Sequence, residues 1–225
     1  MSHINRVPTG ILGLDDMIEG GLPMPSLTLV AGDVGAGKTT FCTQFLCKGA
    51  DQGELGLYFL TYGGPSDLLF EYASTYEFVK RTYFGNKICY IDLENRIEKA
   101  EKFEDVLDAL AEELDKYRPT RIVIENLSVL EEVLKDEYWR FLLKLTHLIK
   151  ARKTVALVTG DSKAGEPYPV QIAQVADGII LLQNEEINFT RRRSIQILKM
   201  CGTSHHLGKY AVDISVKGLI VYPGL

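Results

Sequence analysis

The stretch Gly32-Asp-Val-Gly-Ala-Gly-Lys-Thr-Thr40 is the most informative part of this sequence and decides the fold that we expect. It fits the phosphate-loop pattern G-x-x-x-x-G-K-[ST], in which the fixed positions are Gly32, Gly37, Lys38 and Thr39. Four fixed positions would occur by accident in a chain of this length in roughly one sequence in 100. The stretch therefore predicts a loop whose backbone N–H groups hold phosphate.

The residues on either side of this loop have the pattern that a phosphate loop requires. Residues 27–31 form a short apolar run that predicts a buried strand, and residues 39–50 place their apolar side chains on one helical face. A strand, a glycine loop and a helix N-terminus direct several N–H donors and the positive helix end at one point. Lys38 adds a mobile cation for the outer phosphates. The alternative is an ordinary glycine-rich turn with a solvated lysine.

We therefore predict that the chain binds a nucleoside triphosphate with Mg²⁺. The residues expected to contact the nucleotide are Gly32, Asp33, Val34, Gly35, Ala36, Gly37, Lys38, Thr39 and Thr40. The Thr39 hydroxyl is one expected Mg²⁺ ligand, and Glu125, at the end of a predicted strand, is the other candidate metal residue. In phosphate-loop ATPases a carboxylate at such a strand end holds the Mg²⁺ shell, as a Walker-B residue does. A carboxylate with only a capping role is the alternative.

Length and composition limit the class of protein. With 225 residues, of which 46% are hydrophobic, the chain can bury one α/β core, so we expect a single domain over residues 1–225. The net charge is −5, which provides no overall basic field to attract nucleic acid or acidic lipid. No apolar run approaches the ~20 residues of a membrane span. We therefore expect neither nucleic-acid binding nor membrane insertion.

The cysteines and the N-terminus favour a cytoplasmic protein. Cys42, Cys47, Cys89 and Cys201 form no C-x-x-C pair and lack the spacing of zinc ligands. Reduced and mostly buried thiols are the expected state of such cysteines in the cytosol. The first residues contain no apolar signal core.

The rest of the chain alternates between strand and helix patterns before it changes to strands alone. Helices are expected near 12–18, from residue 65, and over 98–117 and 136–151, and strands over 57–61, 87–91, 121–125 and 154–159. Alternation of this kind predicts a mainly parallel sheet flanked by helices, and therefore an α/β fold. Strands are then expected over 178–183, 191–200, 210–214 and 219–222, with a turn over 184–188. Their spacing predicts antiparallel hairpins added at the sheet edge.

Three segments together resemble the KaiC-like branch of the RecA-type ATPases. They are residues 9–23, which read Thr-Gly-Ile-Leu-Gly-Leu-Asp and then Gly-Gly-Leu-Pro, the phosphate loop with its helix, and residues 191–205, Arg-Arg-Arg-Ser-Ile-Gln-Ile-Leu-Lys-Met-Cys-Gly-Thr-Ser-His. The resemblance covers nearly the whole chain. It implies a RecA-like core that binds ATP or ADP between neighbouring subunits, and a homo-oligomer, either a ring or a dimer. Family members act in several processes, so a protein partner in a larger assembly is a further expectation.

The chain departs from this family at the positions that support hydrolysis. The family usually has two glutamates after the second strand, where Gly63 and Gly64 stand here. It usually supplies a cation to the neighbouring subunit's nucleotide at the position of Cys201, and often has a basic residue at that of Leu207. A glycine cannot orient water through a side chain, and a neutral thiol cannot neutralise phosphate charge. We therefore assign no catalytic residue from the family pattern. Glu125 also replaces the usual aspartate.

Two residues of the third segment match positions that reach the nucleotide of the next subunit. Lys199 is expected to contact a neighbour's phosphate, and His205 lies at a family position near the same trans site, although an ordinary loop histidine is a close alternative. The run Arg191–Arg193 is expected to form a solvated or interfacial face, with Arg191 and Arg193 on the same side of a strand. Binding of a nucleic-acid backbone by this run is the alternative.

The leading hypothesis is an ATP-binding protein with weak or no ATPase activity that uses the nucleotide to set its conformation or assembly. A first rival is a working ATPase that recruits another carboxylate, such as Asp161 just past the strand predicted at 154–159, or one from a partner. An aspartate that only caps a turn is the simpler reading of Asp161. A second rival is a recombinase-like DNA-binding module, which the acidic net charge disfavours.

Overall fold

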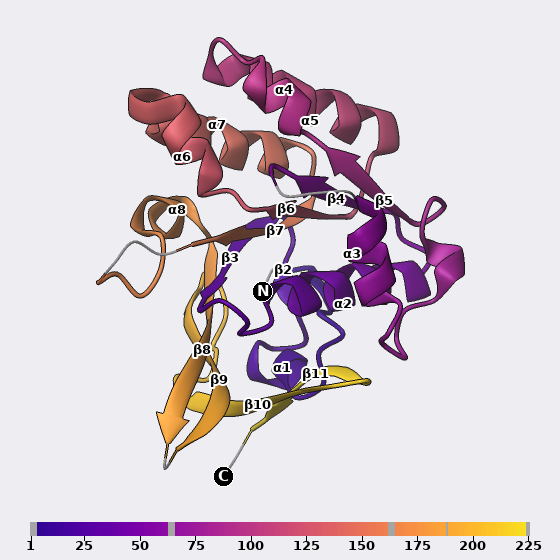
Figure 1. The fold of residues 1–225 in the computed structure, drawn as a ribbon, viewed down its shortest axis with the longest axis vertical. Helices are drawn as coiled ribbons and strands as arrows, with labels where there is room; N and C mark the ends of the chain where they lie inside the picture. The colour runs from indigo at the N-terminus through magenta and orange to yellow at the C-terminus, as the bar shows by residue number, and fades with distance from the viewer. Residues whose placement is uncertain (1–3, 63–65, 162–164, 188, 224–225) are drawn as a thin grey trace.

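A long sheet runs through the computed structural model, which describes residues 4–62, 66–161, 165–187 and 189–223 (Figure 1). In spatial order its strands are β11 (Gly218–Tyr222), β10 (Lys209–Ser215), β9 (Thr190–Met200), β8 (Gly178–Ile187), β3 (Ser26–Gly32), β7 (Val155–Gly160), β6 (Arg121–Glu125), β4 (Gly56–Leu60) and β5 (Ile88–Asp92). Every pairing from β8 to β5 is parallel, and β9, β10 and β11 continue the sheet in antiparallel fashion. The predicted α/β architecture, with antiparallel hairpins at one edge, is confirmed.

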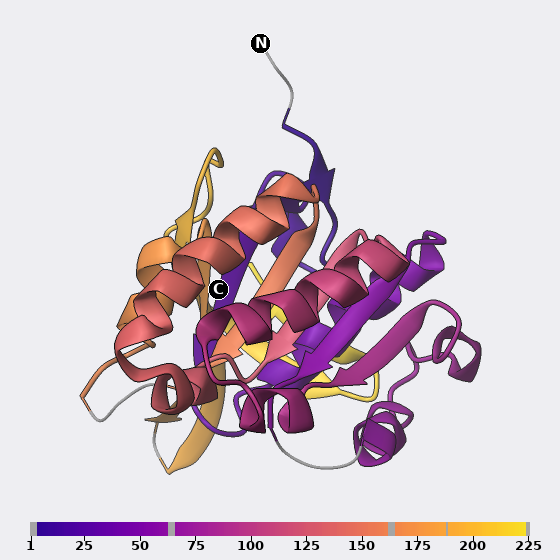
Figure 2. The same cartoon turned by 90° about the horizontal axis from the view of Figure 1, so that it is seen from above.

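Helices cover both faces of the parallel strands (Figure 1), and those on one face lie across the sheet in Figure 2. Cover on both sides explains the nearly continuous apolar runs in the sequence. One core forms where α5 (Phe103–Tyr117) and α7 (Tyr138–Ala151) pack on β3, β4, β6 and β7. The other forms where α2 (Lys38–Asp51) packs on the opposite face and meets β9 and β11. Within the described ranges, no helix is both long and apolar enough to cross a bilayer.

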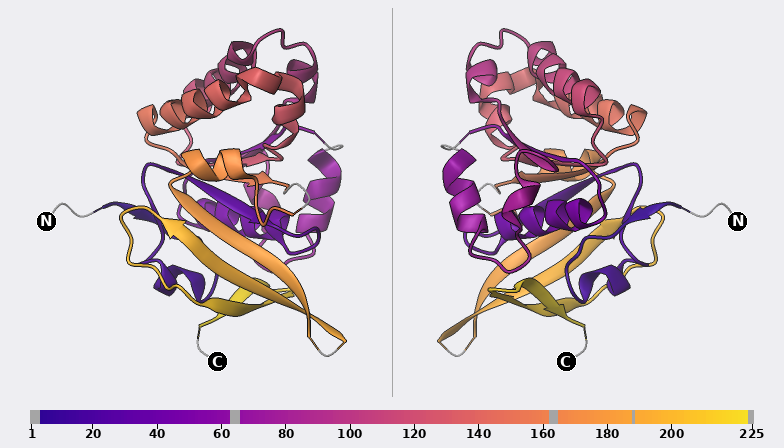
Figure 3. Two further views of the ribbon diagram at one scale, coloured as in Figure 1. Left: turned by 90° about the vertical axis from the view of Figure 1, so that its left-hand side faces the viewer. Right: turned by 90° about the vertical axis from the view of Figure 1, so that its right-hand side faces the viewer.

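The antiparallel strands curl beneath α2, so that the C-terminal part of the chain covers the helix that follows the phosphate loop (Figure 3). The Gln44 side chain of α2 joins the two parts, because its amide nitrogen donates to the Leu219 carbonyl at 3.3 Å and its Oε1 accepts from the Leu219 N–H at 2.9 Å. A short helix α1 (Leu14–Met17) lies beside β10 and β11, and the strand pair β1 (Arg6–Val7) and β2 (Leu22–Pro23) precedes β3.

Two predicted elements differ from the observed ones for identifiable reasons. The helix expected over 98–117 begins only at Phe103, as α5, because the Asp105 carboxylate accepts hydrogen bonds from the N–H groups of Glu101 and Lys102 and so caps its start. A separate short helix, α4 (Glu94–Glu98), precedes it and has no counterpart among the expected helices. The turn expected over 184–188 is wrong, since β8 continues to Ile187 and pairs with Thr190.

The remaining helices are short. Helix α3 (Ser66–Ala73) is the one expected to start near residue 65. Helices α6 (Val129–Leu134) and α8 (Val170–Val175) have no counterpart in the sequence prediction. Helix α6 follows β6, and helix α8 lies between β7 and β8. Both lie near the end of the sheet that carries the phosphate loop, so they shape the surroundings of the candidate site.

Candidate nucleotide-binding site

The phosphate loop connects β3 to α2, and strand β8 holds it from one side. Gly32 has a φ of 143°, and a Cβ atom at this position would lie 1.8 Å from the carbonyl oxygen of Leu182, so only glycine fits. The Asp33 N–H donates to that carbonyl at 3.1 Å, and the Asp33 carboxylate accepts from the Asn184 N–H at 2.6 Å. The Asn184 amide nitrogen also donates to the Val34 carbonyl at 3.1 Å. The first half of the loop is therefore fixed by the neighbouring strand.

Lys38 is folded back over the loop, and its side chain is 13% exposed. Its Nζ donates to the carbonyl oxygens of Gly32 at 2.8 Å and Asp33 at 3.3 Å. The carboxylate oxygen Oδ1 of Asp161 lies 3.6 Å from the same nitrogen. One half-buried cation thus sits among three oxygen acceptors at the point where the loop pattern places the outer phosphates.

Thr39 and Glu125, the two candidate metal residues, are in direct contact. The Thr39 hydroxyl donates to Glu125 Oε1 at 2.7 Å, and the Tyr58 hydroxyl donates to the other carboxylate oxygen. Tyr58 lies in β4, next to β6 in the sheet, and its side chain is buried. Burial, and secondarily the Glu125 charge, raise the pKa of Tyr58 well above its usual value, so the hydroxyl stays a donor.

Tyr58 is a site residue that our reading of the sequence missed. Its only sequence signal is a phenol inside an otherwise apolar strand, Leu57-Tyr-Phe-Leu60. A buried tyrosine hydroxyl normally needs a partner, and that partner is found on the adjacent strand. The additional methylene of Glu125, relative to aspartate, carries its carboxylate to a position between Thr39 and Tyr58.

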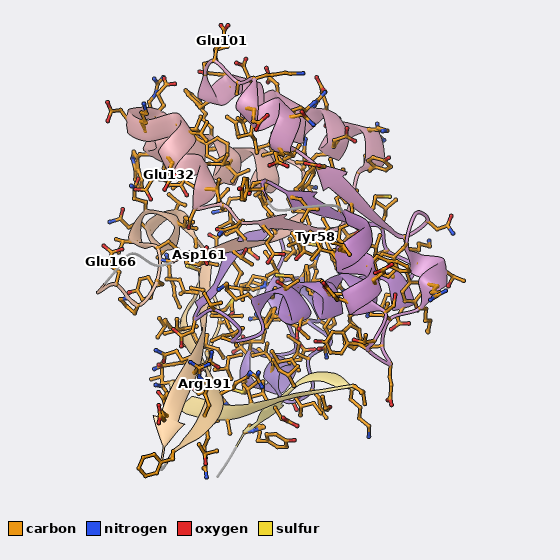
Figure 4. The ribbon with its side chains drawn as sticks, in the orientation of Figure 1. Tyr58, Glu101, Glu132, Asp161, Glu166 and Arg191 are labelled. Atoms are coloured by element: carbon orange, nitrogen blue, oxygen red, sulfur yellow. The ribbon has the colours of Figure 1, made fainter. Side chains whose placement is uncertain are left out.

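Asp161 follows β7, and the next strand, β6, holds it in place. The Asn126 amide nitrogen donates to Asp161 Oδ2 at 2.5 Å, and the Asp161 N–H donates to Ser128 Oγ at 3.0 Å. Asn126 comes directly after Glu125, so the carboxyl ends of two neighbouring parallel strands bring these residues to one edge. Figure 4 labels Asp161 at this edge of the sheet.

A cavity of about 480 Å³ lies over the loop and contains these groups. Its walls also include Tyr76, Ile214 and Arg193. Arg191 and Arg193 are both exposed and, by the regular register of β9, lie on the same side of the strand. Arg193 also reaches the phosphate loop of its own chain, because its Nε donates to the Gly35 carbonyl at 3.4 Å. Alternation along a strand could not reveal this contact, since it depends on the twist of β9.

The residues expected to act in trans lie away from this cavity. Lys199 pairs with Ile179, near the start of β8, and its Nζ donates to the Ala176 carbonyl at 2.5 Å. Leu182, which contacts the loop, is three residues or about 10 Å further along β8. In the segment after β9, Cys201 and Leu207 are exposed and His205 is half-buried. Gly63 and Gly64 lie outside the described residues.

The donor set fits Mg²⁺. A hydroxyl and a carboxylate oxygen, from Thr39 and Glu125, are hard oxygen ligands of the kind that Mg²⁺ prefers. The described residues contain no group of three or more His, Cys, Asp or Glu side chains able to hold a metal ion. Such a group is not required, because Mg²⁺ in nucleotide sites is bound by one or two protein groups together with phosphates and water.

Comparison with known proteins gives one consistent result. A family model described as the KaiC ATPase matches residues 7–225. A UPF0273 protein of Aeropyrum pernix is 28% identical over 235 residues, which cover 98% of this chain and 94% of that protein. The circadian clock protein KaiC3 of Synechocystis sp. is 29% identical over 233 residues, but this chain spans only 46% of its length.

A solved structure agrees with the sequence matches. The crystal structure of a KaiC-like protein from Pyrococcus horikoshii OT3 superimposes with a TM-score of 0.86 and 28% identity, and the match covers 98% of this chain and 100% of that one. The comparisons therefore support a nucleotide-binding function and, in general, the use of Mg²⁺. Because the family model spans nearly the whole sequence, the chain belongs to the KaiC ATPase family.

Proposed function

We propose that residues 1–225 form one nucleotide-binding unit that binds Mg-ATP, hydrolyses it slowly, and uses the bound nucleotide to control its self-association. The observation that carries the binding part is the cluster of Lys38, Thr39 and Glu125 in the cavity over the loop. In this arrangement the loop N–H groups and Lys38 hold the phosphates, while Thr39 and Glu125 hold the metal, which neutralises phosphate charge when bound. ADP would use the same contacts, apart from those to the outer phosphate.

Slow hydrolysis is supported by the residues that replace the family's catalytic groups. A positioned base is typically worth about 10²–10⁴ in rate and an arginine finger about 10³–10⁵. Gly63 and Gly64 provide no carboxylate and Cys201 provides no cation. Since the binding groups are separate from these, the chain would keep its affinity for ATP while losing most of the rate.

Control of assembly is supported by the location of Lys199 and His205. Lys199 lies near the end of β9 that is remote from the phosphate loop, with its Nζ on the Ala176 carbonyl, and His205 follows that strand, so neither lines the cavity over the loop of its own chain. Lys199 can serve a nucleotide only if that nucleotide is bound by a second copy of the chain. A lysine that bridges to a neighbour's phosphates makes ATP a link between subunits, and such coupling is typically worth 1–3 kcal/mol, or 5- to 150-fold in association.

The test combines calorimetry with size exclusion coupled to light scattering, with and without Mg-ATP. Lys38→Ala should abolish tight binding, because it removes the half-buried cation over the loop. Lys199→Ala should weaken ATP-dependent association yet leave the nucleotide affinity of the monomer nearly intact. Lys144→Ala, which changes an exposed lysine on α7, is the matched control and should behave like the parent. A chain that stays monomeric in both conditions contradicts the assembly part, and unchanged affinity in Lys38→Ala contradicts the binding part.

DNA binding is a weaker candidate. Arg191 and Arg192 lie on the exposed part of β9, but they pair across the hairpin with Glu186 and Glu185. These carboxylates cancel much of the positive field that a nucleic-acid backbone would need. A salt titration of DNA binding decides the matter, since a backbone binder loses affinity steeply with salt. The structure therefore favours a protein partner, either a second copy or a member of a larger assembly, over nucleic acid.

A further inference from the structure

We propose that Asp161 is the residue that orients and deprotonates the attacking water in the remaining hydrolysis of ATP. This role deepens the proposed function and rests on the proposed nucleotide binding. Asp161 occupies neither of the positions at which the resembling family carries its glutamates, which are Gly63 and Gly64 in this sequence. The proposal is carried instead by the contacts of Asp161 with Lys38, Asn126 and Ser128.

The first step concerns the distance to the phosphates. Asp161 Oδ1 lies 3.6 Å from Lys38 Nζ, and the lysine of this loop pattern contacts the outer phosphates. The Asp161 carboxylate is therefore beside the γ-phosphate when ATP is bound. An ionised carboxylate accepts hydrogen bonds but donates none, so it cannot bond directly to a phosphate oxygen. A donor has to lie between the two anions: the Lys38 ammonium is one, and a water molecule in the cavity beside the carboxylate is the other.

The second step concerns how the carboxylate is held. Asn126 donates to Oδ2 at 2.5 Å, and Ser128 accepts from the Asp161 N–H at 3.0 Å. The Asn126 side chain is fixed in turn, because its Oδ1 accepts from the Ser128 N–H at 3.1 Å. One carboxylate oxygen is thus tied to the end of β6, while the other faces Lys38. A base held in this way has the fixed direction that water activation requires.

The third step concerns the supply of water. The Asp161 side chain is 59% exposed, and it forms part of the wall between the nucleotide cavity and a second cavity of about 520 Å³. The second cavity is also lined by Asn126, Ser128 and Glu132, all of which are polar. Figure 4 shows Asp161 at the sheet edge and Glu132 beyond it, toward α6. Water can reach the Asp161 carboxylate from this side without passing the phosphate loop.

The other carboxylate of the site is already engaged. Both oxygens of Glu125 accept hydrogen bonds, from Thr39 and from Tyr58, in the arrangement expected for the metal shell. Asp161 is the carboxylate next to Lys38 that has one oxygen facing the phosphate position. In the proposed step, the water oxygen forms a bond to the γ-phosphorus as the bond to the bridging oxygen of the β-phosphate breaks. The water proton passes to Asp161 Oδ1, and the products are ADP and phosphate.

The test compares Asp161→Asn with Glu132→Gln. Asparagine keeps an oxygen for Asn126 but cannot take a proton, whereas Glu132 is an exposed acid in the second cavity. Hydrolysis of γ-labelled ATP is followed under single-turnover conditions, with protein in excess, because the parent rate is expected to be slow. Mg-ATP affinity is measured by calorimetry on the same preparations. Asp161→Asn should lower the rate by about 10² or more with little change in affinity. Glu132→Gln should match the parent in both.

The outcomes separate this inference from the proposed function. If the parent binds Mg-ATP and Asp161→Asn hydrolyses it as fast as the parent, Asp161 is not the base. A parent that binds Mg-ATP but hydrolyses none of it also overturns the inference, and leaves nucleotide-dependent assembly standing. Failure of the parent to bind Mg-ATP would contradict the proposed function itself.

Discussion

Replacing Arg6 with methionine should weaken nucleotide-dependent association without changing the nucleotide site. The Arg6 guanidinium ties the N-terminal strand to the segment that carries Cys201 and His205, because it donates to the Gly202 carbonyl at 3.1 Å and to Thr203 Oγ1 at 2.9 Å. It also contacts Glu19, whose carboxylate accepts from the Ser204 N–H at 3.2 Å. These bonds hold residues 202–204 in one conformation.

The contacts of Arg6 set the size of the effect. Its side chain is 14% exposed, and hydrogen bonds to a charged group contribute about 1.5–3 kcal/mol each when they are well buried. Glu19 is 45% exposed, so water replaces part of what is lost, and a net loss of roughly 1–3 kcal/mol in the free energy of unfolding is reasonable. For a chain of this size, each kcal/mol lowers the melting temperature by about 2–4 °C.

The effect on association follows from conformational entropy. Once Arg6 is removed, the segment 202–204 has to be ordered when a second subunit binds, at about 1–2 kcal/mol for each residue that becomes fixed. Even one such residue weakens association by roughly fivefold to thirtyfold. The nucleotide affinity of the monomer should stay close to that of the parent, because the Arg6 contacts lie beyond the end of β9 that is remote from the phosphate loop.

The assay pairs thermal unfolding with light scattering in Mg-ATP, and calorimetry reports the nucleotide affinity. Arg152→Met is the matched control, since Arg152 makes two hydrogen bonds to Asp115, at 2.9 and 2.8 Å, on a surface away from the segment 202–204. That exposed pair should contribute little to stability and leave association unchanged. If Arg6→Met melts at a lower temperature but associates like the parent, the segment has no role in assembly. Equal weakening in Arg152→Met would mean that only general stability matters.

Three further predictions concern the metal residues, the buried thiols and the lost catalytic groups. Tyr58→Phe removes a hydrogen-bond donor, worth about 1 kcal/mol, from the Glu125 carboxylate that is proposed to hold the metal. ATP affinity measured by calorimetry should therefore fall about fivefold in Mg²⁺ and stay unchanged in EDTA. Burial raises the pKa of Cys47 to about 12. The stability that this thiol contributes is therefore complete below about pH 8.5 and is lost as the pH rises toward 12. The free energy of unfolding in urea should therefore change less between about pH 9 and 11 for Cys47→Ala than for the parent. Combining Cys201→Arg with Gly63→Glu and Gly64→Glu should raise ATP turnover and shorten the lifetime of assemblies in light scattering.

The sequence predicts the parallel half of the sheet well because its strands are short apolar runs buried on both faces. Strand β3, the loop and α2 could be recognised together, since the fixed spacing of Gly32, Gly37, Lys38 and Thr39 stands between an apolar run and an amphipathic one. The reason for glycine at residue 32, the approach of Leu182 in β8, became visible only in the structure. The start of α5 could not be located, because it depends on one carboxylate, Asp105, that caps the helix instead of continuing it. The helical spacing of the apolar residues alone would place the start of the helix earlier. The hydrogen bonds from the backbone to the Asp105 carboxylate favour a cap at this point instead.

The functional contacts that escaped prediction all join separate strands. Tyr58 meets Glu125 across a strand pair, Asn126 meets Asp161 across another, and Arg193 reaches the loop from an antiparallel strand. The sequence identifies the residues of a strand that share a face, but not the side chain that faces them on the next strand. Those contacts require the sheet order and its twist.

The β8–β9 hairpin gives a physical reason for nucleotide binding and association to be coupled in the proposed assembly. At one end of the hairpin, Asn184 and Arg193 contact the phosphate loop of the same chain, and at the other end lies Lys199, the residue proposed to reach a neighbour's nucleotide. The two strands are hydrogen-bonded along this length, with a register shift between Ile179 and Ile180. A change at the loop therefore need not pass through the core to reach the neighbouring subunit. The register shift close to Lys199 interrupts the regular pairing, and we predict that a variant with regular pairing there differs from the parent in Mg-ATP-dependent association by light scattering. Its nucleotide affinity by calorimetry should match the parent, and unchanged association would contradict this coupling.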